Sequence, residues 1–185
     1  MYAIPLGDAE LGPLEPWHAE EFLANIDRGR EFVGQHIGLA DRVTDLVSSR
    51  AFLQSYADKA ATDTGRIYGI REGGKLLGGV LFRTMDVEQG VAEAGCWLEP
   101  AAAGRGLVTR AVRVIIDWAI EDRGIHRVEW RVASANEASI AVARRLGMQR
   151  DGVLREYNFF HGERQDLEVW SVLAPEWRAR QSGAE

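Results

Sequence analysis

Apolar side chains recur at helical spacing in four segments of the chain, separated by glycine, proline and polar residues. The first segment follows Pro16, which suits the first turn of a helix, and the second covers about Thr44 to Ala61. The third runs from about Gly106 to Asp122 with Gly124 as its C-terminal cap, and the fourth covers Asn136 to Gly147. The expected buried positions are Phe22, Leu23 and Ile26 in the first helix, Val47, Phe52, Leu53, Tyr56 and Ala60 in the second, and Val108, Ala111, Val112, Ile115, Trp118 and Ala119 in the third.

Short apolar runs bounded by turn residues predict the strands. The opening stretch, Ala3 to Leu14, suits a brief strand or hairpin, and longer hairpins are expected on either side of Gly73-Gly74 and of His161-Gly162. Further strands are expected at 91–99 and 126–134, and the polar tail after Trp177 is expected to fray. This order predicts an α/β fold of the α+β type, with a mixed, mostly antiparallel central sheet.

Composition narrows the class of protein. The 185 residues, 46% of them hydrophobic, suffice for one core, so a single domain over residues 1–185 is expected. A net charge of -6 argues against binding a nucleic-acid backbone and fits an amine-bearing partner better. Cys96 is the only cysteine, and neither a leader segment nor an apolar run of roughly 20 residues is present, which predicts a cytoplasmic protein without a membrane partner.

A Gly-x-Gly turn between a strand and a long helix is the main chemical clue. Gly104 and Gly106 let the backbone approach an anion closely, and the N–H groups at the helix start favour phosphate. Arg105 and Thr109 could add side-chain donors to the same anion. Plain turn chemistry explains two glycines equally well. Because neither a third glycine in dinucleotide-binding spacing nor a Gly-Lys-Ser/Thr sequence occurs, any phosphate site must be of another kind.

Four blocks of the chain together resemble a known family. They read AEAGCWLEPAAAGRGLVTRAV, HRVEWRVASANEASIAVARRLGM, DGVLRE and HGERQDLEVWSVL, the last followed shortly by EW. In this order and at these separations they are similar to the GNAT superfamily of N-acetyltransferases, and within it to the RimJ and RimL type of ribosomal-protein-alanine acetyltransferase. The resemblance implies one GNAT-like domain with helices on both faces of the sheet, a splayed strand pair that holds coenzyme A, and acetyl-CoA or another acyl-CoA such as succinyl-CoA as cosubstrate.

The resemblance also implies which residues bind the cofactor. The strand from Cys96 to Glu99 should carry a β-bulge and splay away from the strand at Val128 to Ala133, leaving room for the pantetheine arm. Backbone groups of Trp97, Leu98 and Glu99 should pair with its amides, Asn136 should bind the cofactor, and N–H groups of Gly104, Arg105, Gly106 and Leu107 should cradle the pyrophosphate. Two departures stand out: Ala101 replaces the usual Gln or Arg of the pyrophosphate turn, and Cys96 replaces a common Tyr.

Acyl transfer to an amine needs a proton acceptor, a donor to the tetrahedral oxyanion and help for the leaving thiolate. The backbone N–H near Leu98 can serve the oxyanion. By resemblance, Ser139 is expected beside the departing sulfur, although helix capping together with Asn136 would also explain it. Glu93 matches an acidic position of the family and is the candidate base, with an exposed strand carboxylate as the alternative.

The other candidate residues are weaker, and no metal site is expected. The four histidines lack ligand-like pairing, and Cys96 is interpreted as a small buried thiol rather than a nucleophile. Packing is the expected role of Trp97, Trp118, Trp130 and Trp170. The acceptor site is expected to involve Trp17, Phe32, His36, Tyr157 or Asp166.

These observations predict an acyl-CoA-dependent N-acyltransferase that acts by direct attack in a ternary complex. The expected acceptor is the amino terminus of a protein or peptide. A small amine or amine-bearing antibiotic is the alternative acceptor, and a non-catalytic CoA-binding sensor is the alternative class. A homodimer formed through the sheet edge or the last hairpin is compatible with this fold.

Overall fold

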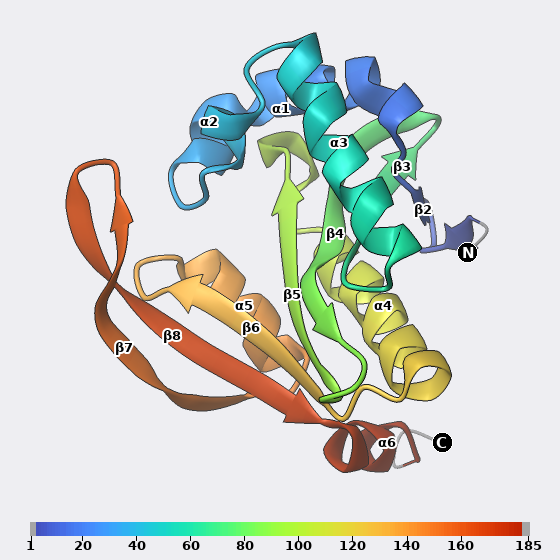
Figure 1. Cartoon of the computed structure of the whole chain (residues 1–185), viewed down its shortest axis with the longest axis vertical. Coiled ribbons are helices and arrows are strands. Elements are labelled where there is room, and N and C mark those ends of the chain that lie inside the picture. Colours follow the sequence, from blue (N-terminus) through green and yellow to red (C-terminus); the bar gives the residue numbers. More distant parts are fainter. Residues whose placement is uncertain (1–2, 183–185) are drawn as a thin grey trace.

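A computed structural model describes residues 3–182, and all strands in that range form one eight-stranded sheet in the order β1-β2-β3-β4-β5-β6-β8-β7 (Figure 1). The strands are β1 (Ile4–Pro5), β2 (Glu10–Pro13), β3 (Arg66–Glu72), β4 (Lys75–Asp86), β5 (Val91–Leu98), β6 (Arg127–Ala133), β7 (Gln149–Phe160) and β8 (Glu163–Leu173). The helices are α1 (Ala19–Gly34), α2 (Leu39–Arg42), α3 (Leu46–Ala61), α4 (Leu107–Arg123), α5 (Glu137–Arg145) and α6 (Ala174–Ser182), with 3-10 turns η1 (Pro16–His18) and η2 (Pro100–Ala102). The predicted α+β class with a mostly antiparallel sheet is confirmed.

β5 and β6 are the one parallel pair of this sheet, and they are joined only at their N-terminal ends. Four residue pairs connect them, from Val91 with Arg127 to Ala94 with Trp130. Beyond these pairs the two strands separate, so the predicted splay is confirmed. The predicted position of the bulge was wrong: the register with β5 shifts on β4 at Arg83, while Cys96 to Leu98 continue in regular antiparallel pairing with β4.

Helices α1, α2 and α3 cover one face of the sheet over β3 to β5 (Figure 1). Phe22 and Ile26 of α1 and Leu53 of α3 are fully buried there, as their helical spacing predicted. Asp45 caps α3, because its carboxylate accepts a 2.7 Å hydrogen bond from the Ser48 N–H. Val47 is 79% exposed, so its predicted inward orientation was wrong. It follows the cap on the outer side of the first turn.

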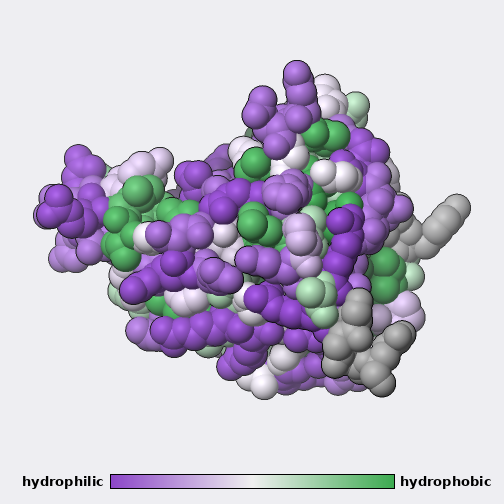
Figure 2. Space-filling view, turned by 90° about the horizontal axis from the view of Figure 1, so that it is seen from below, coloured by the Kyte–Doolittle hydropathy of each residue, from purple (hydrophilic) through white to green (hydrophobic). Residues whose placement is uncertain are grey.

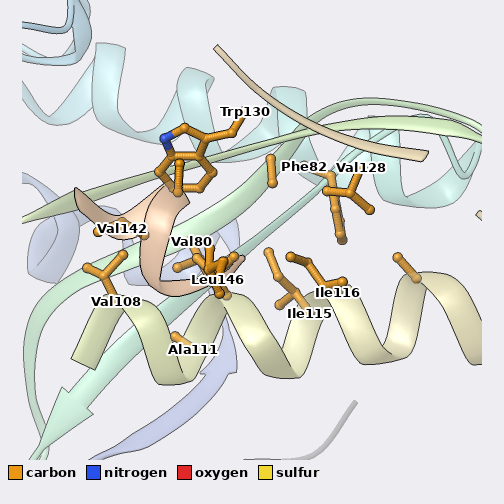
Figure 3. Packing of buried hydrophobic residues seen from close by; sticks show 14 of the residues in the cluster. Val80, Phe82, Val108, Ala111, Ile115, Ile116, Val128, Trp130, Val142 and Leu146 are labelled. Carbon is orange, nitrogen blue, oxygen red and sulfur yellow. The ribbon is translucent and has the colours of Figure 1, made fainter. Parts of the chain in front are cut away.

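Helices α4 and α5 pack on the opposite face and form the larger core with β4, β5, β6 and β8. Figure 3 shows Ile115 and Ile116 of α4 directed toward Phe82 and Val128 of the strands. Gly124 ends α4 in the left-handed conformation that its role as a C-terminal cap requires, with φ +67°. Trp97, Trp130 and Trp170 are buried as predicted, and Trp118 is partly buried beneath the Arg66 guanidinium.

The last hairpin, β7 with β8, extends beyond the other strands, and its tip approaches α2 (Figure 1). His161 and Gly162 form its turn with φ +50° and +85°, as predicted. At the tip, His161 Nε2 lies 3.2 Å from Asp41 Oδ2 of α2. After β8 the chain forms α6, so the predicted fraying tail is instead helical up to Ser182. Trp177 anchors α6 through a 2.6 Å hydrogen bond from its indole N–H to Asp117 of α4.

One face of the molecule is predominantly polar. The face seen from below in Figure 1 is mostly hydrophilic, with apolar side chains in separate small groups (Figure 2). Within residues 3–182, no helix has the length and apolar character needed to cross a membrane.

Candidate active site

A cavity of about 1080 Å³ passes through the sheet where β5 and β6 separate. On the α4 face its lining includes Gly104, Gly106 and Thr109. In the gap it is lined by residues of β5, β6 and α5, and on the other face by residues of α1, α2, α3 and β7. A two-sided passage of this kind can hold one substrate from each face of the sheet.

The backbone of β5 faces the gap at alternate residues. The N–H of Glu99 donates to Leu77 O of β4 at 2.8 Å, so the polar groups of Glu99 and, two residues earlier, Trp97 point toward β4. Those of Cys96 and Leu98 point toward the gap. Of the three residues expected to offer backbone groups to pantetheine, Trp97 and Glu99 thus turn theirs to β4, and Leu98 turns its own to the gap.

Glu99 is instead the centre of a buried polar network between the end of β5, α1 and β4. Its side chain is only 3% exposed and accepts hydrogen bonds from Arg28 Nε at 2.7 Å, Lys75 Nζ at 3.0 Å and Asn25 Nδ2 at 3.2 Å. The Asn25 amide oxygen in turn accepts a 2.9 Å hydrogen bond from the Trp97 indole. Burial raises the pKa of Glu99, but the hydrogen bonds from Arg28 and Lys75 outweigh it and hold this pKa below its usual range. The network fixes the end of β5 against α1.

The turn before α4 has the geometry of an anion site. Gly104 and Gly106 have φ +77° and +72°, and a side chain added at Gly104 would meet nothing within 4 Å. The backbone N–H groups of residues 104–109 have no hydrogen-bond acceptor within the described part of the chain. They stand at the positive end of a 17-residue helix. These donors fit a pyrophosphate without help from side chains.

Arg105 does not serve this site with its side chain, contrary to expectation. Its guanidinium turns away from the cavity to Glu72 and Asp8, the latter at 2.6 Å, and these hydrogen bonds raise its pKa. Thr109 lines the cavity, and Ala101 in η2 supplies no charge. Arg145 of α5, which the sequence did not single out, is the basic side chain that lines this part of the cavity.

Asn136 and Ser139 line the gap from the start of α5. The Asn136 amide oxygen caps the helix by accepting a 3.1 Å hydrogen bond from the Ser139 N–H, so its amide nitrogen stays available to a ligand. The Ser139 hydroxyl oxygen accepts a 2.9 Å hydrogen bond from the Trp130 indole N–H. Because the indole can only donate, the hydroxyl proton of Ser139 is left for a group in the gap. Asn136 and Ser139 therefore form the helix cap and also lie beside the gap.

Glu93 lines the cavity where β5 and β6 begin to separate. Its carboxylate accepts a 2.8 Å hydrogen bond from Arg83 Nε and lies 3.9 Å from Arg131 Nε. Its side chain is 15% exposed, so the exposed strand carboxylate considered as an alternative is not observed. Among the described residues that line the cavity, Glu93 is the one carboxylate.

Cys96 lines the gap, where burial raises the pKa of its thiol to about 12. A thiol with this pKa is fully protonated near neutral pH and is a poor nucleophile. No group of three or more His, Cys, Asp or Glu side chains among residues 3–182 is arranged to hold a metal ion.

The predicted acceptor residues separate into two groups. Phe32, His36 and Tyr157 line the cavity on the α1–α3 face, whereas Trp17 and Asp166 do not. Trp17 is 75% exposed on η1. The Asp166 carboxylate accepts a 2.8 Å hydrogen bond from the Glu156 N–H and so holds the irregular part of β7.

Sequence reasoning did not place three basic residues that line the α1–α3 face of the cavity: Arg42, Lys59 and Arg83. Arg83 belongs to the strand-hairpin pattern, and Lys59 to the polar side of a predicted helix. Nothing in their spacing shows that α2, α3 and β4 direct them toward a common space.

Known proteins that resemble this chain are acetyltransferases by name. The family model described as an acetyltransferase (GNAT) domain matches residues 9–149. The Bacillus subtilis protein YdaF, whose assignment as a ribosomal N-acetyltransferase is provisional, is 29% identical over 169 residues, which cover 89% of this chain and 90% of YdaF.

Two solved structures have the same fold. The structure of RimL, a ribosomal L7/L12 alpha-N-protein acetyltransferase in complex with coenzyme A, has a TM-score of 0.88 at 19% identity and covers 92% of this chain and 97% of RimL. The microcin C7 self-immunity acetyltransferase MccE, in complex with acetyl-CoA and AMP, has a TM-score of 0.83 at 24% identity, with coverage of 90% and 92%.

Proposed function

Because the chain belongs to the acetyltransferase (GNAT) domain family and is an acyl-CoA-dependent acetyltransferase, we propose that it acetylates the amino terminus of a peptide or protein. The observation that carries this proposal is the cavity that crosses the sheet between β5 and β6. Acetyl-CoA occupies its α4 side, and the acceptor enters from the α1–α3 face. The provisional assignment of YdaF and the name of RimL support an acceptor of this class.

The free N–H groups of residues 104–109 hold the pyrophosphate, and these backbone hydrogen bonds compensate for the side-chain contact that is missing at Ala101. Pantetheine lies in the gap, where backbone groups of Cys96 and the carbonyl group of Leu98 pair with its amides, and the Asn136 amide nitrogen donates to it. Leu107 and Thr109 complete the cofactor site. This assignment keeps the predicted residues except the backbone groups of Trp97 and Glu99 and the side chain of Arg105.

The reaction needs no enzyme nucleophile. The neutral amine attacks the thioester carbonyl, a C–N bond forms, and the tetrahedral oxyanion accepts a hydrogen bond from the Leu98 N–H, which faces the gap. The C–S bond then breaks. The Ser139 hydroxyl, held by Trp130, donates a hydrogen bond to the leaving sulfur, and the proton lost by the amine ends on the thiol of coenzyme A.

Glu93 is our candidate for accepting the amine proton, directly or through water, since it is the carboxylate that lines the cavity beside the gap. Replacing Glu93 by Gln should lower kcat at neutral pH and weaken the dependence of the rate on pH. Glu129→Gln is the matched control, because Glu129 also pairs with Arg131, at 3.0 Å, but does not line the cavity. An equal loss of kcat in the two variants would show that Glu93 only positions Arg83 and Arg131 and does not accept the proton.

The decisive experiment measures free-thiol release from acetyl-CoA and succinyl-CoA with amine-bearing peptides and with small amines. Gly104→Glu should abolish turnover, because it places a negative side chain where the pyrophosphate binds. Ser139→Ala should lower kcat about tenfold or more, as expected for loss of a general acid or donor. Turnover of small amines but of no peptide would replace the peptide acceptor by a small-molecule amine. Binding of coenzyme A without any turnover would favour a sensor.

We extend the proposal to a cytoplasmic location, supported by the free thiol of Cys96. A single catalytic domain over residues 1–185 and a homodimer remain predictions. Gel filtration with light scattering tests the dimer.

A further inference from the structure

The acceptor face of the cavity has an excess of positive charge. Arg42, Lys59, Arg83 and Arg131 line it together with one carboxylate, Glu93. The chain as a whole has a net charge of -6, so this excess runs opposite to the balance of the molecule. A local field of this sign in a cleft attracts anionic groups.

Two of these cations have no carboxylate partner within residues 3–182. The Arg42 guanidinium lies over the Phe52 ring at 5.3 Å from its centroid. Lys59 Nζ lies 5.0 Å from the Tyr56 ring centroid and donates a 2.8 Å hydrogen bond to the Arg83 carbonyl oxygen. By contrast, Arg83 pairs with Glu93, and Arg131 pairs with Glu129. Arg42 and Lys59 therefore keep unused charge on one side of the cavity.

Burial, together with the charges of Arg42 and Arg83, lowers the pKa of Lys59. Lys59 is partly buried beside the Tyr56 ring, which reduces the screening that water would give an anion bound to it. An anion placed here would relieve the repulsion between Arg42 and Lys59.

We propose that Arg42 and Lys59 bind a side-chain carboxylate of the acceptor peptide, so that the preferred acceptors have an acidic residue directly after the amino-terminal residue. This inference rests on the proposed peptide acceptor. The position along the peptide is inferred from two hydrogen bonds: Lys59 Nζ donates to the Arg83 backbone carbonyl oxygen, and the Arg83 Nε donates to Glu93 at the entrance to the gap. An extended peptide advances about 3.3–3.6 Å per residue, so the second side chain lies next to this entrance.

The phosphates of acetyl-CoA do not explain these cations. The donors that hold the pyrophosphate are the N–H groups of residues 104–109 on the α4 face, whereas Arg42 and Lys59 extend from α2 and α3 on the opposite face. The acceptor is the substrate that meets both side chains.

The test uses C-terminally amidated tetrapeptides that differ only at the second residue, Asp or Asn. We expect the Asp peptide to have a kcat/KM about tenfold higher at low salt, and the ratio to shrink in 0.5 M salt, because Arg42 is exposed and salt screens its attraction for the carboxylate. In the double variant Arg42→Gln, Lys59→Gln the ratio should fall to about one to two. Arg164→Gln is the matched control: Arg164 also lies over an aromatic ring, Phe159 at 5.3 Å, but outside the cavity, and its loss should leave the ratio unchanged.

A ratio near one in the unaltered protein, or a ratio that survives the double variant, would overturn the inference. A preference for small anionic amines over every peptide would also overturn it, while leaving an anion site on this face. If no acceptor is turned over, the proposed function is refuted, but the inference about Arg42 and Lys59 is not. Calorimetric binding of the Asp and Asn peptides, in the presence of coenzyme A, then still decides whether Arg42 and Lys59 discriminate between them.

Discussion

Replacing Glu99 by Gln removes one negative charge from the buried network that joins the end of β5 to α1 and β4, while keeping the size of the side chain. Three hydrogen bonds lose their ionised acceptor, those from Arg28, Lys75 and Asn25. A hydrogen bond to a charged group contributes about 1 kcal/mol more than a neutral one, and the new amide N–H₂ cannot accept from either cation. Since Arg28 and Lys75 are 36% and 53% exposed, water replaces part of the loss, and we expect the free energy of unfolding to fall by about 2 kcal/mol.

Urea unfolding followed by tryptophan fluorescence measures this difference, which corresponds to a fall in Tm of about 4–8 °C for a domain of this size. The control is Glu121→Gln, because the Glu121–Arg178 pair is exposed on both sides and should contribute less than about 1 kcal/mol.

The dependence on pH gives a second measurement. The pKa of Glu99 is lowered from an ordinary value of 4.5, so its contribution is fully present above about pH 4.5 and is lost as the pH falls through the lowered pKa. The stability difference between the original protein and Glu99→Gln should therefore be constant from pH 7 to 5 and shrink below that. A difference under about 0.5 kcal/mol at pH 7, or one that grows on acidification, would refute this account of the network.

Three further predictions concern packing, thiol reactivity and catalysis. Gly79→Ala should destabilise the fold by about 1–3 kcal/mol in urea titration, because a Cβ there would lie 2.2 Å from a core tryptophan ring and from a backbone carbonyl, whereas Gly152→Ala meets no atom within 4 Å and should be nearly neutral. Cys96, with a thiol pKa of about 12, should react with iodoacetamide far more slowly at pH 7.5 than a solvent-exposed cysteine of ordinary pKa, and its rate should increase as the pH rises. Rapid labelling of the folded protein would contradict this. Trp130→Phe removes the hydrogen bond to Ser139 and should lower kcat with little change in the KM for acetyl-CoA; a change confined to KM would argue against this role of the hydroxyl.

Local patterns predicted most of the fold. Helical spacing identified the buried sides of α1 and α4, and the glycine-containing pairs Gly73-Gly74 and His161-Gly162 identified two hairpin turns, since both signals arise from neighbouring residues. The pattern did not show α2, which is a single turn of four residues that packs against α1 and α3. A segment this short is helical because of its tertiary contacts.

Helix-cap positions could be predicted, but the destinations of long charged side chains and the direction of the β5 backbone groups could not. Asn136 caps α5 through a contact three residues away, so its position followed from the sequence. Arg105 instead reaches Asp8, 97 residues away, and Glu99 meets Arg28 from α1. Which acid pairs with which base depends on how distant elements pack, and no local spacing records that.

The separation of β5 and β6 leaves the sheet incomplete in a way that links folding to substrate supply. The two halves of the sheet are joined by four residue pairs, and the backbone of Cys96 and Leu98 faces a gap rather than a strand. A ligand that fills this gap with amide groups acts as a missing piece of strand and binds only the native state. By mass action, saturation at a hundred times the dissociation constant adds about 2.7 kcal/mol to the free energy of unfolding. The thermal stability of this enzyme in a cell would therefore follow the local concentration of acetyl-CoA.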